Sequence, residues 1–289
     1  MKNVTSSAKV RRFLSNSFVH ILLAALAIIW LFPVFWVVMK SFSTDIGIYS
    51  KSFFPEELTL ANYARLFNDT TVLNFPQMFK NTFIVACFSC VVSTFMVLAV
   101  SYCMSRLRFK MRKSYMNMAM ILTLFPGFMS MIAVYYILKA LGLSEGAMIR
   151  VALVMVYSGG AGIGFYVAKG FFDTIPKALD EAALIDGATK WQIFTKITMP
   201  LSKPIVVYTV LTSFMGPWTD FIFAKVICRA SADYYTVSVG LWKMLEKEYI
   251  AKWFTSFAAG AVLISVPISI LFIVTQKFYA DGMSGAVKG

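Results

Sequence analysis

The sequence predicts an all-α, polytopic membrane protein with six transmembrane helices and both termini in the cytoplasm. Of its 289 residues, 59% are hydrophobic and only 14% are charged, well below the roughly 25% usual in soluble domains. The apolar residues gather in six runs of about 20 residues, the length of helix that crosses a hydrocarbon layer about 30 Å thick. Backbone polar groups have no water to bond in lipid, so these runs should be helices.

Each run is long enough to form one span. The first follows a basic stretch, as a signal peptide would, but it is too long for the apolar region of a signal and has no small-residue cleavage site after it. We therefore expect it to be a retained anchor. The six runs are Ser17–Met39, Asn81–Cys103, Tyr115–Leu138, Met148–Ala168, Ile205–Cys228 and Phe257–Phe278.

The basic residues predict the orientation of the chain. With the amino terminus in the cytoplasm, that side holds 16 basic and 5 acidic residues, and the outer side holds 11 basic and 9 acidic residues. Five of the basic residues fall within residues 106–113. This asymmetry predicts that both termini lie inside, and it explains the net charge of +13 without a nucleic-acid partner.

The predicted spans divide the chain into four parts. Residues 1–16 are a cytoplasmic segment, and residues 17–80 hold the first span and an external loop. Residues 81–278 form a core of five spans, which includes a polar cytoplasmic loop at residues 169–204. Residues 279–289 are a cytoplasmic tail.

Few side chains suit catalysis, metal binding or nucleotide binding. The four cysteines fall inside spans, where cysteine packs as a small apolar residue. The glycine-rich residues 159–164 also lie inside a span with no strand before them, which favours close helix packing over dinucleotide binding. No Gly-Lys pair occurs, so a Walker A motif is missing. We expect no enzyme, no metal site and no cofactor on this chain, and any ATP chemistry should belong to a partner.

The polar cytoplasmic loop predicts two short helices joined by an elbow at Gly187. Thr174 and Pro176 suit the start of the first helix, as a capping residue and as a residue of its first turn. Gly187 suits its end, because glycine readily adopts the left-handed conformation. The second helix is expected over residues 189–198, and Pro200 should stop it before the fifth span.

The first of these helices presents an acid and small residues. Glu181 offers a charge-assisted hydrogen bond to an arginine or lysine, and Ala182 and Ala183 permit close approach, so the loop would dock into a groove on a soluble protein. The alternative is an amphipathic helix pair that lies on lipid. The neighbouring acids Asp180 and Asp186 count against it, because anionic head groups would repel them.

Asp220 is the one acidic residue inside a predicted span, and such residues usually face a cavity or a partner. With Trp218 and a proline beside it, Asp220 is a candidate for the substrate pathway. An equal alternative is that it lies near the outer interface and caps a broken helix.

The last external loop, residues 229–256, carries aromatic residues among charges. Tyr234, Tyr235 and Trp242 suit contact with another protein or with sugar. The alternative is an aromatic belt at the membrane interface, and for Trp253 the two are equally weighted.

The cytoplasmic loop resembles the EAA loop of binding-protein-dependent ABC importers, whose pattern is E-A-A-x(3)-G-x(9)-I-x-L-P. Met199 departs from the pattern, which has leucine there. Residues 53–67, 81–92, 101–113 and 170–188 resemble the carbohydrate-uptake subfamily, and residues 283–289 are similar to the end of its smaller, six-span maltose and maltodextrin permeases. The residues that match the EAA pattern are Glu181, Ala182, Ala183, Gly187, Ile197 and Pro200.

This resemblance implies the type I ABC importer permease fold. In that family the EAA loop sits in a cleft of an ATPase subunit and couples ATPase closure to alternating access. On this chain Glu181 would be the ion-pair partner, Ala182 and Ala183 the close-contact surface, and Gly187 the elbow.

The resemblance also implies partners and cargo. The partners are a second permease subunit, two ABC ATPase subunits that bind ATP and Mg, an extracytoplasmic sugar-binding protein, and the lipid of the cell (inner) membrane. The cargo is carbohydrate such as maltose or maltodextrin, with another oligosaccharide or a polyol as the alternative. A secondary transporter is disfavoured, because it would need coupling acids in the membrane and no EAA loop.

Overall fold

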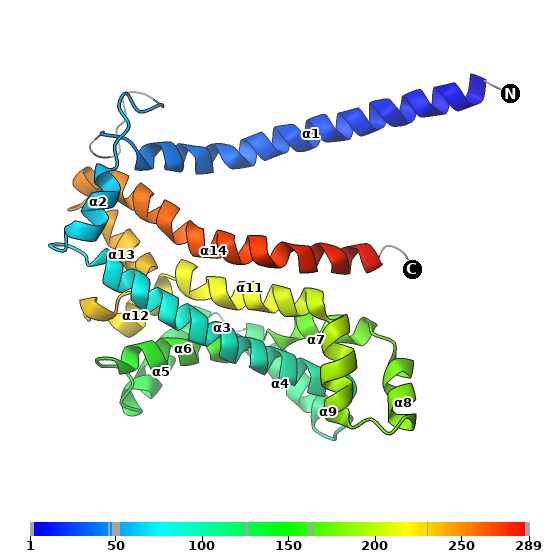
Figure 1. Ribbon diagram of the computed structural model, residues 1–289. Helices are drawn as coiled ribbons and strands as arrows, with labels where there is room; N and C mark the ends of the chain where they lie inside the picture. Colours follow the sequence, from blue (N-terminus) through cyan, green and yellow to red (C-terminus); the bar gives the residue numbers. More distant parts are fainter. Residues whose placement is uncertain are drawn as a thin grey trace. The chain divides into compact units, whose positions relative to one another are not determined.

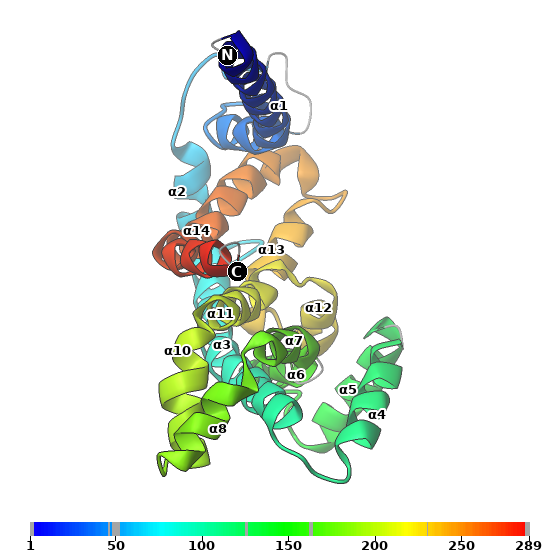
Figure 2. The ribbon, with the colours of Figure 1, turned by 90° about the vertical axis from the view of Figure 1, so that its right-hand side faces the viewer.

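The computed structural model describes residues 3–45, 47, 53–124, 127–161, 164–229 and 231–286. In these ranges the chain is helical, and the only strand-like feature is an isolated bridge between Ser43 and Leu58. Figures 1 and 2 show the helices from two directions. They are α1 (Asn3–Ser41), α2 (Ala61–Asn68), α3 (Phe75–Arg106), α4 (Arg112–Leu124), α5 (Gly127–Ala140), α6 (Met148–Ala161), α7 (Phe165–Thr174), α8 (Lys177–Ile185), α9 (Lys190–Ile193), α10 (Met199–Leu201), α11 (Lys203–Thr219), α12 (Ile222–Cys228), α13 (Val237–Met244) and α14 (Ile250–Ala286).

Three helices of the described chain are long and apolar enough to cross a membrane. They are residues Leu14–Ser41 of α1, the whole of α3, and residues Ile250–Phe278 of α14. Three bent pairs of helices pass the same test together: α4 with α5, α6 with α7, and Lys190–Leu201 with α11. The described residues therefore hold three clear spans, and up to six if each bent pair is one span.

Three of the six expected spans are not single helices. The run Tyr115–Leu138 divides into α4 and α5, Met148–Ala168 into α6 and α7, and Ile205–Cys228 into α11 and α12. Hydropathy averages over a window and does not register single helix-breaking residues. The breaks fall beside Gly127, within the glycine-rich stretch 159–164, and at Asp220. Residues 125–126 and 162–163 lie outside the described chain.

The glycine-rich stretch does not pack as expected. A Cβ atom added at Gly159 or Gly160 would meet nothing within 4 Å among the described residues. The prediction that these small residues allow close helix approach is therefore wrong for the two glycines, as far as contacts within the chain go.

The chain divides into two compact units. The first comprises Met1–Leu66 with Met244–Val262, and the second comprises Phe67–Lys243 with Leu263–Gly289.

In the second unit, α3 packs against α6, α7 and α11 (Figure 1). Helix α3 begins six residues before the predicted Asn81, because the Asn74 side chain accepts a hydrogen bond from the Gln77 N–H and Pro76 needs no donor in the first turn. One apolar cluster at the far end of α3 joins it to α7 and α11 and fixes the segment that enters the polar loop at residues 169–204. Its buried members are Val97, Leu98, Ala168, Phe172, Ile175 and Ile205.

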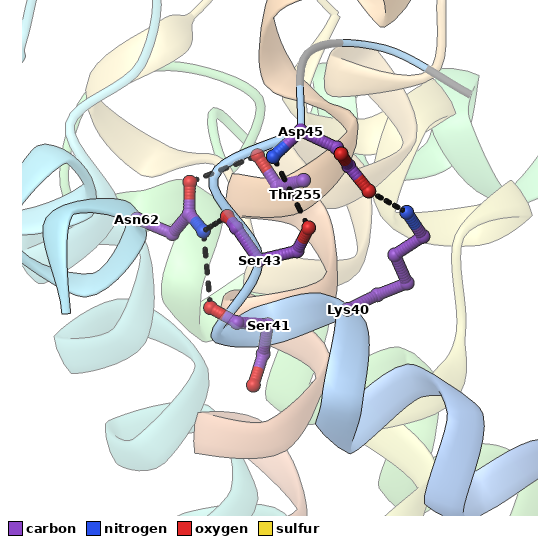
Figure 3. A network of polar contacts seen from close by, with 6 residues as sticks. All are labelled: Lys40, Ser41, Ser43, Asp45, Asn62 and Thr255. Carbon is purple, nitrogen blue, oxygen red and sulfur yellow. Dashed lines mark hydrogen bonds and ion pairs between the residues drawn. The ribbon is translucent and has the colours of Figure 1, made fainter. Parts of the chain in front are cut away.

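In the first unit, Asn62 of α2 ties together three segments that are distant in sequence. Its Nδ2 donates to the backbone oxygens of Ser41 at 3.1 Å and Ser43 at 2.8 Å, and its Oδ1 accepts from Thr255 Oγ1 at 2.8 Å (Figure 3). Lys40 forms an ion pair with Asp45 at 2.6 Å beside this network. The amide of Asn62 thus satisfies backbone groups that the end of α1 leaves unpaired.

Trp253 lies in the same unit and is 3% exposed. The guanidinium of Arg65 lies 4.1 Å from the centre of its ring and donates to the Lys252 carbonyl at 2.7 Å. Trp253 is therefore a packing residue under Arg65. It is too buried to belong to an aromatic belt at the membrane interface or to an open contact surface.

Candidate functional site

The first helix of the polar loop at residues 169–204 is α8, and its start differs from the prediction. Pro176 occupies the capping position and makes no side-chain capping bond. The hydroxyl of Thr174 donates to the Phe171 carbonyl at 2.7 Å within α7 instead, so Thr174 as a cap of α8 was wrong. Asp180 lies in the first turn of α8, where a negative charge favours the helix dipole.

The elbow forms at Gly187 as predicted. Gly187 has a φ of 82°, which glycine adopts without the steric cost of a Cβ atom. Its N–H donates to the Leu184 carbonyl at 3.1 Å, and the Ala188 N–H donates to the Ala183 carbonyl at 2.9 Å. These two bonds form a Schellman motif, which satisfies the last carbonyls of α8.

The second helix starts with a capping box. Thr189 Oγ1 accepts from the Gln192 N–H at 3.3 Å, and Gln192 Oε1 accepts from the Thr189 N–H at 2.7 Å. The two bonds pair backbone donors that have no partner inside the helix, so the chain re-enters a helix within two residues of the elbow.

Pro200 does not stop this helix, contrary to the prediction. Helix α9 continues through a π turn at Phe194–Thr198 into α10, which contains Pro200. The π turn is wider than an α turn, and it relieves the clash of the proline ring with the carbonyl four residues back. The helix ends at Leu201 instead, where the chain bends by 82° into α11.

Arg106, the last residue of α3, holds α8 in place. Its Nη2 donates to the carbonyls of Phe172 and Ile175, each at 2.9 Å, and its Nη1 lies 3.3 Å from Asp180 Oδ2. The side chain of Arg106 is 4% exposed and that of Asp180 is 16% exposed. One guanidinium therefore binds the end of α7 and the first turn of α8.

Aromatic contacts hold the second helix against α3. The rings of Tyr102 and Phe194 are 4.7 Å apart, and Phe194 also contacts Trp191 at 5.6 Å. Ile193 is buried at 3% exposure. Both arms of the elbow are therefore fixed to the end of α3.

The elbow leaves a mixed acidic and apolar surface open. Glu181 and Ala182 are exposed, Ala183 is buried against its own chain, and Ile197 is half-buried. Pro200 is exposed. The apolar side chains that face outward on this surface are Leu179, Leu184, Ile185, Trp191 and Leu201, with Ile185 at 87% exposure.

Asp220 caps the start of α12 at the break in the helix, which agrees with the capping part of the alternative prediction. Its carboxylate accepts from the N–H groups of Phe223 at 3.3 Å and Ala224 at 3.0 Å, at the start of α12. The hydroxyl of Tyr157 donates to Asp220 Oδ2 at 2.8 Å. Trp218 is 1% exposed and packs on the ring of Phe79 at 5.2 Å.

The three aromatic residues proposed as an outer contact surface have different environments. Tyr235 is buried, and its hydroxyl donates to the Arg229 carbonyl at 2.8 Å. Tyr234 lies under the guanidinium of Arg150 at 5.1 Å. Trp242 is 52% exposed, and its ring packs at a tilt against that of Phe221, with the ring centres 4.8 Å apart. The segment between α12 and α14 contains the helix α13.

Asn81 and Arg150 hold this outer surface, and sequence reasoning missed both. Asn81 is fully buried and donates to the carbonyls of Asp233 at 2.8 Å and Tyr235 at 3.2 Å. Its Oδ1 accepts from Arg150 Nε at 3.0 Å. A signal was present in the sequence, since Arg150 lies inside a predicted span and ionisable residues there need partners.

The apolar helices and the polar helical elbow define an integral membrane protein of the permease class. The described chain has enough apolar helix for three to six spans, and the elbow is fixed to the end of one of them. Residues 96–285 match the family described as the binding-protein-dependent transport system inner membrane component. The chain belongs to this family.

Full-length relatives support this assignment. The chain is 35% identical over 283 residues to the galactooligosaccharides transport system permease protein GanQ of Bacillus subtilis (strain 168), covering 97% of this chain and 98% of that protein. It is 31% identical over 287 residues to the maltodextrin transport system permease protein MalD of Streptococcus pneumoniae (strain ATCC BAA-255 / R6), covering 99% and 100%.

A solved structure shares the fold. It is a chain of a bacterial ABC transporter involved in the import of the acidic polysaccharide alginate. The TM-score is 0.74 at 22% identity, with 92% of this chain and 96% of that chain covered. The expected type I importer permease architecture therefore agrees with this neighbour.

Proposed function

We propose that the chain is the membrane-spanning permease subunit of an ATP-driven importer for short oligosaccharides. The support is that two relatives aligned over their full length are named for galactooligosaccharides and for maltodextrin. Maltodextrin, which the sequence suggested, is one of these two cargo classes. The test is reconstitution with the partner subunits and the binding protein, with ATP hydrolysis measured across a panel of both oligosaccharide classes and unrelated sugars. No stimulation by any oligosaccharide would refute the proposal.

The proposal includes a topology and a set of partners. The bent pairs α4 with α5 and α6 with α7 each count as one span, and α11 with α12 forms another, while Lys190–Leu201 belongs to the polar loop. The termini lie in the cytoplasm, and residues 81–278 form the core in the cytoplasmic membrane. A second permease subunit, two ATPase subunits that hold ATP and Mg, and an extracytoplasmic sugar-binding protein complete the importer. Trp218 and Asp220 have a supporting role beside the substrate pathway and do not contact the sugar. The reason is that Trp218 is buried against Phe79 and the carboxylate of Asp220 is bound by Tyr157 and by the start of α12.

The elbow formed by α8 and α9 is the proposed coupling element. The observation that carries this proposal is the exposed acid Glu181 beside exposed apolar side chains on a helix that Arg106 fixes to a membrane span. When the ATPase moves this surface, the movement reaches α3, because Arg106 binds α8 and the end of α7 to the end of α3. To switch access, the ATPase must bind it with different free energy in two states, since equal binding shifts no equilibrium.

Glu181→Arg is expected to leave the chain folded and to uncouple it. Glu181 is exposed, so the change costs little stability in this chain, whereas a charge-assisted hydrogen bond to a basic residue of the ATPase would be lost. Such a bond contributes about 1.5–3 kcal/mol, so sugar-stimulated ATP hydrolysis should fall by roughly tenfold or more. The measurement is ATP hydrolysis of the reconstituted complex with and without sugar-loaded binding protein.

The matched control is Glu145→Arg, the same charge reversal at an exposed acid in the turn between α5 and α6. It should keep wild-type stimulation. If Glu181→Arg also retained wild-type stimulation, the coupling role of Glu181 would be wrong.

Tyr234 and Trp242 are the proposed contact surface for the binding protein. Trp242 is half-exposed and its ring packs against that of Phe221, and exposed tryptophans are frequent anchors of interfaces. Tyr235 contributes by positioning, because it is buried.

Trp242→Ala should raise the concentration of binding protein that gives half-maximal stimulation by roughly tenfold, while basal ATP hydrolysis stays unchanged. Trp242→Phe should retain most of the contact area and serves as the control. An unaltered concentration dependence for Trp242→Ala would remove this surface from the proposal.

A further inference from the structure

The turn between α3 and α4 carries basic residues that the coupling role does not use. Arg106 is directed inward to Asp180, as described above. The four that follow line a hollow of about 520 Å³, together with Phe109, Met116 and Asn117. We call this hollow the basic-turn pocket, and its basic residues are Arg108, Lys110, Arg112 and Lys113.

The basic-turn pocket has an uncompensated positive charge. None of the described residues forms an ion pair with Arg108, Lys110 or Lys113. The acid near Arg112 is Asp173, and this carboxylate is already bound by Lys169 at 2.6 Å and by Ser105 at 2.6 Å. The pocket therefore fits an anionic ligand.

The surroundings of the pocket specify what kind of anion fits. The pocket lies where α3, a membrane-spanning helix, ends and where the apolar helix α4 begins. Phe109 within the pocket is 43% exposed, and further along α4 the side chains of Met118, Met120 and Ile121 are 56%, 60% and 57% exposed. A free inorganic anion would make no use of these apolar side chains, whereas a lipid presents a charged group and an acyl chain together.

We propose that the basic-turn pocket binds the phosphate head group of an anionic phospholipid, with an acyl chain along the exposed face of α4. Basic pockets at the ends of membrane helices have the charge and the position for such head groups. Arg108, Lys110 and Lys113 donate to the phosphate, and Phe109 and Met116 contact the first methylene groups. The pocket lies at the end of α3 that bears Arg106, so the bound lipid anchors the base of the coupling element.

The test uses the full complex in phosphatidylcholine vesicles that contain a photoactivatable phosphatidylglycerol or a photoactivatable phosphatidylcholine. The peptide that covers residues 107–124 should be labelled by the phosphatidylglycerol probe and only weakly by the phosphatidylcholine probe. The triple variant Arg108→Gln/Lys110→Gln/Lys113→Gln should lose at least about tenfold of the phosphatidylglycerol label, because each basic residue near the surface contributes roughly 1 kcal/mol. If that variant does not assemble, Arg108→Gln alone should lose roughly fivefold.

The control is Lys80→Gln/Lys139→Gln/Lys247→Gln, which removes the same charge at three exposed lysines outside the pocket. It should keep the label. Equal labelling by the two probes would overturn the proposal, because only apolar contact would remain. An equal loss in the control would also overturn it, since net charge would then suffice. Absence of label from both probes would overturn it by showing that a protein subunit covers the pocket.

Discussion

Replacing Arg106 by glutamine is expected to release α8 from the end of α3 and to abolish the proposed coupling. The substitution removes the donor to the Phe172 and Ile175 carbonyls and leaves the carboxylate of Asp180 without its cation. Removing one partner of a buried ion pair costs about 3–5 kcal/mol. Hydrogen exchange of residues 177–188 should therefore accelerate by at least about a hundredfold, and sugar-stimulated ATP hydrolysis should fall with it.

Two further variants separate this effect from general damage. Lys139→Gln also removes one positive charge, at an exposed site on α5, and it should leave the exchange of α8 unaltered. Asp180→Asn combined with Arg106→Gln should be less destabilised than the sum of the two single variants, because no unpaired buried charge remains. Strictly additive effects would show that the pair does not act as a unit.

Replacing Asn81 by leucine is expected to have the second large effect, on the stability of the second unit. Asn81 uses both donors and both acceptor positions of its amide, and leucine of similar size satisfies none of its partners. Each buried group left without a partner costs about 1–3 kcal/mol. We expect a clear fall in melting temperature in detergent and faster hydrogen exchange at residues 233–237.

The control for Asn81 is Asn117→Leu, since Asn117 is exposed on α4. It should melt close to the wild type. Asn81→Asp tests the assignment of the amide, because it keeps the acceptor toward Arg150 and loses both donors to the carbonyls. A wild-type melting temperature for Asn81→Leu would contradict the role assigned to this residue.

The parts of the candidate site that were predicted correctly depend on neighbours in sequence. The elbow at Gly187 needs a left-handed residue and two nearby backbone bonds, and the second helix was expected from residue 189 onward because of its apolar and polar pattern. Such features follow from residue chemistry over a few positions. The six apolar runs were visible for the same reason, although six spans and the orientation stay predictions.

The parts that could not be predicted depend on contacts between distant segments. Arg106 was counted only as a basic residue of the cytoplasmic side, because nothing local shows that it meets Asp180. Trp218 was named for the pathway from its neighbours in sequence, which do not show that it is buried against Phe79. Pro200 was expected to stop a helix, but a π turn next to it absorbs the clash. In each case tertiary packing overrides a rule that holds for an isolated segment.

The polar network around Asn62 sets an order of events during synthesis of the protein. The bond from Thr255 to Asn62 joins residues 193 positions apart, and the bond from Arg65 to the Lys252 carbonyl joins residues 187 positions apart. At about 5–20 residues per second, the ribosome needs roughly 10–40 s to make the intervening chain. Helix α1 therefore cannot complete the contacts of the first unit until α14 has been made. Cellular quality control has that interval in which to act on an unfinished chain.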